Sequence, residues 1–488
     1  MITSTRNQVH STSPEYDAMA EDWALPIALM GGEKLMKEAS TTYLPQMPLE
    51  SDAAYLQRLE RTTLKNFFAW TIRNHVGRVF NKPIRLDDNT PDVIKKHNEN
   101  IDLMGNDINT FYKPVFQEAL THGISYVYVD FPRNMAEMSY AEEQTMNLRP
   151  YCIHVRAAQV IQAVPEWVNG RVVLGRAHIM EVINKPVGKW GVEYTTQVRV
   201  LYPGYWEVWR QEPGKTSWVA VDGGKTSLQY IPLFAYYGEK TGFYTGISPL
   251  QNLAYLNKAH WNSLSDQMNI THYARVPLLF GPGMEDVPEG EDLKFSSDSI
   301  ITAHPDADLK YVEHTGAAID AGLKEVKDLE ERMIIEGLTM LAEGSSFDTA
   351  TGKSLDISDR NSALQDSAKR FQEFITRINL CMCDWENIER TGEAIVNTDF
   401  GLHLKDGSEL NILLKARQNK SISLETFWSE FQRRQVLPRD FDAETEKKLL
   451  EEERELNLAA APYTDETGKL VVGRDKEEDV DTGKPRIE

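Results

Sequence analysis

The chain has 488 residues and a mass of 55.6 kDa, a length that predicts roughly three domains of ordinary size. Its 53 Lys and Arg residues against 74 Asp and Glu residues give a formal net charge of −21. That balance argues against a protein that holds nucleic-acid phosphates tightly on a basic surface. Three cysteines, Cys152, Cys381 and Cys383, exclude a disulfide scaffold and fit folding in a reducing compartment.

The N-terminus carries no targeting signal that the sequence makes visible. Residues 1–14 are polar, without an apolar signal core, and predict a loose arm. No window of the chain approaches the ~18 apolar residues that a membrane span needs. We therefore expect a protein that is made in a cytoplasm.

Helical periodicity dominates the first part of the chain. Residues 15–36 follow a weak helical pattern. Beyond a loop marked by two prolines, Ser51 or Asp52 is a suitable cap for a long amphipathic helix or a helix pair, which ends at residues 81–83. A further helix is expected from Asp107 to Gly123.

Strand patterns then replace the helices. Residues 124–132, ISYVYVDFP, are rich in β-branched and aromatic residues, and seven further strand-like runs follow up to residue 237, separated by Gly and Pro. Helices followed by consecutive short strands favour an α+β fold with antiparallel pairing over an alternating Rossmann arrangement.

Three long helices are expected after Gly246. The first begins at Ser248, a cap residue followed by proline, and continues to 273. One face of it is expected to carry residues at a spacing of three or four: Leu250, Leu253, Asn257, Trp261, Leu264 and Met268. The second occupies about 317–341, and the third follows residue 362 with a four-and-three spacing typical of a seam against another helix. The seam residues are Leu364, Ala368, Phe371, Ile375, Ile378, Met382 and Trp385.

Two inserts separate these helices, and a helical region follows them. Residues 274–316 predict a small strand-containing module, whereas the polar residues 344–361 form a loop too long for a simple connector, and hence a candidate functional element. Helices are expected again at 409–462. From 463 to 488 the chain has few apolar groups and predicts disorder.

The sequence contains no recognisable catalytic or metal-binding motif. GxGxxG, Walker A, GxSxG and HExxH are all absent. The pair Cys381 and Cys383 lacks the second pair and the spacing of a metal hook, so both are interpreted as ordinary core or surface thiols. We expect no cofactor and no metal. Two clusters of basic residues among acidic neighbours are interpreted as a solvated helix face, with contact to DNA or an acidic partner as the alternative: Lys415, Arg417 and Lys420, then Arg433 and Arg434.

Several strings, in their order and spacing, resemble the portal proteins of tailed bacteriophages, and most of all a portal family long described as a domain of unknown function. They are YLPQMPLESDAAYLQRLERTTLKNFFAWTIRNHVGRVFNKP (43–83), GISPLQNLAYLNKAHWNSL (246–264) and TATGKSLDISDRNSALQDSAKRF (349–371). RPYCIHVRAAQVIQAV (149–164) is similar to a strand segment of that family, but Ala163 and Val164 replace its usual aromatic end. The resemblance extends from about residue 15 to about 450.

The resemblance implies a portal-type fold and a role for each segment. Its parts would be a wing at 15–247, stem helices at 248–273 and 317–343, a clip at 274–316, a tunnel loop at 344–361, a helix returning to the wing at 362–408 and a helical crown at 409–462. Subunits of this family form a ring, typically of twelve copies, at one vertex of the capsid. Double-stranded DNA passes through it non-specifically during packaging and ejection.

The resemblance also implies partners and channel residues. The large terminase subunit, the head–tail adaptor, the major capsid protein and the scaffold would bind the ring, which would be assembled in the host bacterial cytoplasm and end in the virion. Small polar side chains and one cation of the tunnel loop would face the DNA: Ser345, Ser346, Thr349, Thr351 and Lys353. The chain itself is not expected to be an enzyme.

Two alternatives remain open at the level of sequence. One is a hydrolase or transferase with an unrecognised site in the α+β region. The other is a helical scaffold or adaptor of a different assembly. A large annular particle distinguishes the portal interpretation from both.

Overall fold

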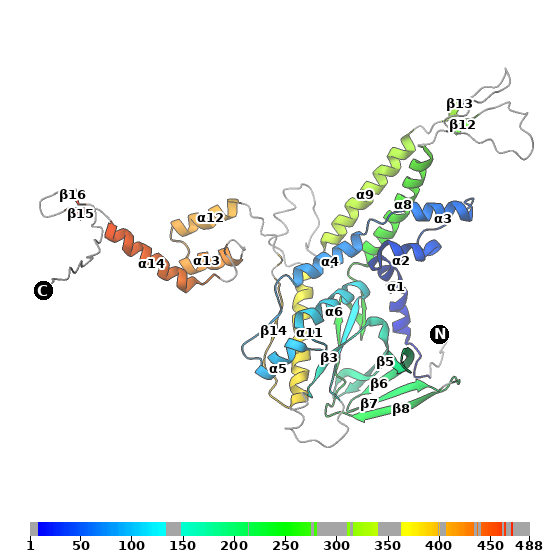
Figure 1. Cartoon of the computed structure of the whole chain (residues 1–488), viewed down its shortest axis with the longest axis horizontal. Coiled ribbons are helices and arrows are strands. Elements are labelled where there is room, and N and C mark those ends of the chain that lie inside the picture. Colours follow the sequence, from blue (N-terminus) through cyan, green and yellow to red (C-terminus); the bar gives the residue numbers. More distant parts are fainter. Residues whose placement is uncertain are drawn as a thin grey trace, which may run out of the picture. The chain divides into compact units, whose positions relative to one another are not determined.

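In a computed structural model of the chain, the described residues are 8–132, 148–212, 214–274, 278–280, 310–312, 316–339, 363–398, 400, 407–433, 437, 441–460, 463–464 and 470–471. The chain divides into two compact units, residues 1–400 and 401–488. Both helices and antiparallel strands are present (Figure 1), so the predicted α+β class is confirmed.

A three-stranded antiparallel sheet lies at the centre of the first unit. Its order is β3 (Tyr151–Val155), β2 (Ile124–Asp130) and β9 (Leu233–Tyr237). All but the last residue of β2 are buried, because each face of the strand meets a different layer. The predicted strand at 124–132 is thus confirmed, and its β-branched and aromatic residues fit a strand covered on both sides.

A five-stranded antiparallel meander covers one face of the central sheet. It consists of β4 (Val160–Val168), β5 (Arg171–Val187), β6 (Gly191–Tyr202), β7 (Tyr205–Gln211) and β8 (Trp218–Lys225). The even-numbered residues of β2 pack against it, because side chains alternate across a strand. This core joins Ile124, Tyr126 and Tyr128 to Ala177, Ile179 and Leu201.

Two helices cover the opposite face of the central sheet. They are α6 (Ile108–His122) and α11 (Ala363–Glu386), and Val127 and Val129 of β2 belong to the same core. The side chain of Asp107 caps α6 by accepting a hydrogen bond from the backbone N–H of Thr110 at 2.9 Å. Gly123 ends the helix at φ +85°, and a Cβ there would lie 2.3 Å from the backbone of Ile247, so only glycine fits.

The seam of α11 is buried as its spacing predicts, but its partner differs from the expected one. Six of the seven seam residues are fully buried, and Trp385 is partly buried. The helix packs on β9, β2 and β14 as well as on α5, rather than along a single helix. Phe371 lies at the centre, with ring centroids 4.7 Å from Tyr236 and 5.0 Å from Phe116. A heptad-like spacing reports one buried face, and a sheet can bury that face as well as a helix can.

Helices at the N-terminus flank these layers. They are α1 (Pro14–Met30), α2 (Gly32–Glu38), η1 (Ser40–Thr42), α3 (Asp52–Arg61), α4 (Phe67–Val79), α5 (Asp92–His97) and η2 (Asn98–Asn100). The amphipathic stretch is therefore a helix pair, and Ser51 caps α3 by accepting from the N–H of Ala54 at 3.3 Å. The short strands β1 (Arg85–Leu86) and β14 (Ala394–Ile395) pair and bring the chain after α11 back to this region.

The N-terminal arm departs from the loose segment expected at 1–14. Within residues 8–13, the N–H of Ser13 donates to the carbonyl oxygen of Ile161 at 3.0 Å, and the Nδ1 atom of His178 lies 2.8 Å from the carbonyl oxygen of Val9. The His10 ring stacks on Trp218 with centroids 5.0 Å apart. The expectation was wrong for these residues because they are held by hydrogen bonds to backbone carbonyls and by one ring contact. Such contacts produce no periodic pattern of hydrophobic residues in the sequence.

The remaining elements follow β9 in chain order. They are β10 (Glu239–Gly242), β11 (Thr245–Ile247), α8 (Gln251–Ala274), β12 (Leu278–Phe280), β13 (Lys310–Val312) and α9 (Ala317–Thr339), with η3 (Ala157–Gln159) earlier, between β3 and β4. The second unit contains α12 (Gly407–Gln418), α13 (Leu424–Arg433), α14 (Ala443–Ala460), β15 (Tyr463–Thr464) and β16 (Leu470–Val471). The last two strands pair antiparallel, so the predicted disorder of 463–488 is wrong there. Hydrogen bonds between backbone groups need few apolar residues.

Replacing Phe371 by Ala tests the central packing. Phe371 is fully buried among aromatic rings, so Phe371→Ala is expected to lower the free energy of unfolding by about 3–5 kcal/mol. Denaturant unfolding followed by tryptophan fluorescence measures it. The matched control is Lys369→Ala on the exposed face of α11, expected to change stability by less than about 0.5 kcal/mol. Equal effects of the two variants would contradict this packing.

Candidate functional site

The helix pair α8 and α9 is the candidate functional element, because it corresponds to the two predicted stem helices. The two helices lie side by side (Figure 1). Their register comes from three contacts: Gln267 Nε2 to Ile319 O at 2.9 Å, Ser263 Oγ to Glu325 Oε1 at 3.2 Å, and His260 Nε2 to Glu330 Oε1 at 3.3 Å. One residue number falls as the other rises, so the helices are antiparallel.

The seam between these helices is more polar than the sequence predicts. Leu250, Leu253 and Trp261 are buried as expected, but Leu264 and Met268 are only half-buried. Ser265 and Gln267 are the buried side chains of that part of α8 instead. The apolar stripe was wrong here because the neighbouring groups on α3 and α9 are polar and need hydrogen-bonding partners.

A buried ion pair attaches α8 to the N-terminal helices. Arg58 donates to both carboxylate oxygens of Glu50 at 2.8 Å, and the two side chains are 2% and 8% exposed. A further guanidinium N–H donates to Ser265 Oγ on α8 at 3.2 Å, and Thr62 Oγ1 lies 2.8 Å from the same oxygen. The hydrogen bonds from Arg58 hold the pKa of Glu50 below its usual value.

A second polar contact joins α8 to the start of α4. Asn257 is fully buried. Its side-chain oxygen accepts from the N–H of Phe68 at 3.0 Å, while its side-chain nitrogen donates to the carbonyl oxygen of Lys65 at 3.0 Å. The first turn of a helix leaves backbone N–H groups without helical partners. Asn257 accepts a hydrogen bond from one such group of α4, and this contact fixes the axial position of α8.

Glu330 extends this contact to α9. Lys65 Nζ lies 2.6 Å from Glu330 Oε1, and His260 lies 3.3 Å from the same oxygen. Although burial opposes the shift, hydrogen bonds from these two residues hold the pKa of Glu330 below its usual value. Burial also lowers the pKa of His260, so the imidazole is neutral at pH 7. Lys65 and His260 therefore connect both helices to the segment that precedes α4 through one carboxylate.

The outward faces of the pair are partly apolar and partly acidic. Five large apolar side chains of these two helices are at least 36% exposed: Tyr255, Ile270, Leu323, Ile334 and Ile335. On α9, acidic residues outnumber basic ones by six to three. The pair therefore offers apolar area for a neighbour and an acidic face for solvent.

The predicted channel residues lie outside the described residues. Ser345, Ser346, Thr349, Thr351 and Lys353 all fall within 340–362. The structure describes the two elements that flank this segment, α9 up to Thr339 and α11 from Ala363. No contact of the five side chains is described, so their role stays a prediction.

One Ser–His–carboxylate cluster bears on the alternative of a hydrolase. Ser125 Oγ lies 2.9 Å from His154 Nε2, and Glu118 Oε2 lies 2.8 Å from that same nitrogen. A catalytic relay needs the acid on one ring nitrogen and the nucleophile on the other. Ser125 is also fully buried and donates to Glu118 at 2.8 Å. The cluster is therefore a structural polar contact beneath the central sheet.

The cysteines are also structural. Cys152, Cys381 and Cys383 are all buried free thiols, and burial raises the pKa of Cys381 to about 12. Within the described ranges, no group of His, Cys, Asp or Glu side chains is arranged to hold a metal ion. None of the helices in the described part of the chain combines the length and hydropathy of a membrane span.

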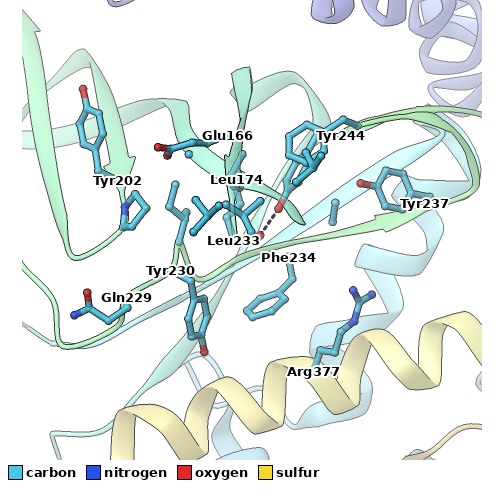
Figure 2. A pocket seen from close by; sticks show the side chains of 18 of the residues that line it. Glu166, Leu174, Tyr202, Gln229, Tyr230, Leu233, Phe234, Tyr237, Tyr244 and Arg377 are labelled. Carbon is cyan, nitrogen blue, oxygen red and sulfur yellow. Dashed lines mark hydrogen bonds between the residues drawn. The ribbon is translucent and has the colours of Figure 1, made fainter. Parts of the chain in front are cut away.

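A cavity of about 930 Å³ lies between the two sheets and α11 (Figure 2). No sequence pattern indicates this cavity, because its walls come from separate segments between Glu166 and Arg377. Its lining is rich in tyrosine: Tyr202, Tyr205, Tyr230, Tyr237 and Tyr244. Tyr230 donates to Asp384 and Tyr244 donates to the carbonyl oxygen of Leu233, so these hydroxyls serve packing and not proton transfer.

Comparisons with known proteins give one family and several structures. The family profile described as "Domain of unknown function (DUF4055)" matches residues 249–386, and no protein with a curated description matches the chain. The matched range contains α8, β12, β13, α9 and α11 in order.

Three solved structures are similar to the chain at a TM-score of 0.40. One is from the virion of a native gene transfer agent (GTA) particle, with 8% identity over 82% of this chain and 98% of that chain. The others are the neck of a native GTA particle computed with C12 symmetry (9% identity, 80% and 96% coverage) and the neck of an empty particle computed with C6 symmetry (8%, 73% and 86%). Structural similarity at a TM-score of 0.40 does not establish the function of this chain.

The buried ion pair generates a stability prediction. Arg58→Met leaves the Glu50 carboxylate buried without its partner, so the free energy of unfolding is expected to fall by about 3–5 kcal/mol. The double variant Arg58→Met with Glu50→Leu removes both charges and is expected to cost less. Urea unfolding at pH 7 measures both, and a double variant less stable than Arg58→Met would contradict this.

The same pair predicts a pH dependence. Because the pKa of Glu50 is lowered in the folded protein, its stabilising contribution is complete above the ordinary glutamate pKa, about 4.3. It is lost as the pH falls through the lowered value. The stability gap between the unmodified protein and Glu50→Gln should therefore narrow below about pH 4.

Proposed function

We propose that this chain is a portal subunit of a tailed bacteriophage or a related particle. In this proposal, copies of the chain form a ring at one capsid vertex, and double-stranded DNA passes through the opening during packaging and ejection. The chain contributes structure and has no catalytic activity of its own. The helices α8 and α9 form the stem, and the segment between them forms the clip.

The observation that carries the proposal is the helix pair held against the N-terminal helices by buried polar contacts. Arg58 and Asn257 fix α8 to the N-terminal helices, while apolar side chains on the outward faces remain exposed. Such helices are stable when neighbouring copies cover their apolar area, and a closed ring does so without leaving an open end. The match of the family profile to residues 249–386 supports treating these elements as one functional block.

Electrostatics support a channel that does not retain DNA. Each phosphate neutralised by Lys or Arg adds salt-dependent affinity, so a basic wall would slow movement. A net charge of −21 per chain gives a ring of twelve a charge on the order of −250 before screening. The excess of acidic over basic residues makes α9 negative, as a channel wall that does not retain DNA requires.

The tunnel loop and the docking partners belong to the same proposal. Residues 344–361 follow the second stem helix, and their hydroxyl groups and Lys353 make brief contacts with the passing backbone. The clip at 274–316 binds the large terminase subunit during packaging and the head–tail adaptor afterwards. The wing contacts the major capsid protein and the scaffold.

Particle mass distinguishes the proposal from its alternatives. The purified 55.6-kDa chain is expected to form a particle of more than half a megadalton in mass photometry, with a central opening in negative-stain images. A monomer or dimer would favour a compact enzyme instead. A large particle without an opening would favour a helical scaffold of another assembly.

Substitutions in the loop test its contact with DNA. Lys353→Ala, combined with Ala at Ser345, Ser346, Thr349 and Thr351, is expected to lower the fraction of filled heads severalfold without changing ring mass. Lys369→Ala, an exposed cation on α11, is the matched control. Unchanged packaging and DNA retention in the loop variant would remove these residues from the proposal.

A further inference from the structure

Within the described residues, the outer part of the β5–β6 hairpin pairs with no other strand. β4 pairs with β5 only as far as Ile179, and β7 pairs with β6 only from Gln197. The two strands remain paired with each other as far as Val187 and Gly191. We call residues 182–196 the ribbon. A lone two-stranded hairpin is marginally stable in water. A ribbon of this length is therefore expected to pack on another protein surface.

The ribbon exposes an unusual amount of apolar surface. Trp190 in its turn is 86% exposed, Tyr194 is 69% exposed and Val182 is 62% exposed. Two opposite charges flank the tryptophan. Lys189 precedes it, with its ammonium 4.9 Å from the ring centroid, and Glu193 follows three residues later. Tryptophan with a charged surround is the residue type that most often anchors a protein interface.

The cavity has a complementary arrangement of charge. Figure 2 shows Glu166 and Arg377 on opposite sides, with Leu233 between them and with Tyr230 and Tyr244 on the two other sides. Lys240 also lines it and stacks over the Tyr237 ring at 5.2 Å. The Arg377 guanidinium is exposed and has no hydrogen bond or ion pair with any residue in the described ranges. The cavity is thus lined by aromatic and aliphatic side chains, with an anionic group on one side and cationic groups on the other.

One wall of the cavity is held in a strained conformation. Tyr244 has φ +54°, a left-handed value that is rare for a bulky side chain. Its ring stacks on Tyr126 with centroids 6.1 Å apart, and its hydroxyl donates to the carbonyl oxygen of Leu233 at 2.8 Å. Strain of this kind persists where the surrounding structure enforces it, and it is common at binding sites.

The ribbon cannot fill the cavity of its own chain. The cavity touches β5 at residues 172–175, whereas the ribbon turn lies beyond Val187 at the other end of the same strand. At a rise of about 3.3 Å per residue, the two are roughly 40 Å apart. A contact between them therefore joins two different copies.

We infer that Trp190 of one subunit inserts into the tyrosine-lined cavity of a second copy of this chain. Glu193 then faces Arg377 and Lys240, and Lys189 faces Glu166. The contact joins two different surface patches, so repeating it either closes a ring or builds an open filament. The inference deepens the proposed function by naming a contact between wings, and it rests on that function only for the closure of the ring.

Cross-linking tests the contact. The full chain with Val192→Cys and Gln229→Cys keeps Trp190 and places one thiol on the exposed ribbon and one on the exposed rim of the cavity. The natural cysteines are buried and react slowly. A short bis-maleimide is expected to give a ladder of covalent multimers in denaturing gels. The control is Val192→Cys with Leu56→Cys, whose second site lies on the exposed face of α3, and it should give none.

Each outcome of this experiment is decisive. Annular particles without a ladder above the control overturn the contact but leave the proposed function intact. A ladder from open chains, without rings, supports the contact and overturns the portal proposal. Monomers without a ladder overturn both.

A charge reversal provides an independent test. Arg377→Glu and Glu193→Arg are each expected to weaken association of subunits about tenfold, measured by dilution in mass photometry. The two changes together should restore most of the loss, because the pair is reversed. A merely destabilised fold would not be rescued, so additive losses would overturn the contact.

Discussion

The attachment of α8 to the N-terminal helices is the interaction on which the rest of the structure depends. Arg58, almost completely buried, donates to Glu50, to Ser265 and to the carbonyl oxygen of Pro45. A buried charge that loses its partner lowers stability strongly. Arg58, Glu50 and Ser265 therefore keep one relative position in the folded protein. Hydrophobic burial would allow the helix to slide by a turn, whereas these directional bonds fix where the helix pair leaves the sheets.

These hydrogen bonds explain why the contact between α8 and its neighbours contains buried polar side chains, such as Ser265 and Gln267, at positions where apolar ones are expected. The contacts of Asn257, His260 and Glu330 continue the same polar seam from α4 to α9. Apolar residues are displaced to the outward faces, where a neighbouring copy is needed to cover them. In the proposed ring, the fixed direction of the pair matters because every copy must present the same face to the channel.

Sequence predicted the layers of the fold well and the candidate site less well. The four-and-three spacing from Leu364 to Met382 reports a buried face, and every one of those residues is buried. The spacing of α8 failed at Leu264 and Met268, because burial there follows the hydrogen-bonding needs of Arg58 and Ile319 and not hydrophobicity. The docking of residues 8–13 involves backbone carbonyls, which any sequence supplies. The cavity between the sheets is lined by segments that lie far apart in the sequence, so no local sequence pattern predicts it.

A density map of the assembled full-length chain tests the central claim most directly. If the polar attachment sets the direction of the stem, such a map should show α8 and α9 of every copy lining one axial opening wide enough for a DNA duplex. In the same map, the Arg58 side chain should lie between Glu50 and Ser265 at the base of each pair. A map with these helices buried inside a compact globule, and with no opening along an axis, would contradict the account.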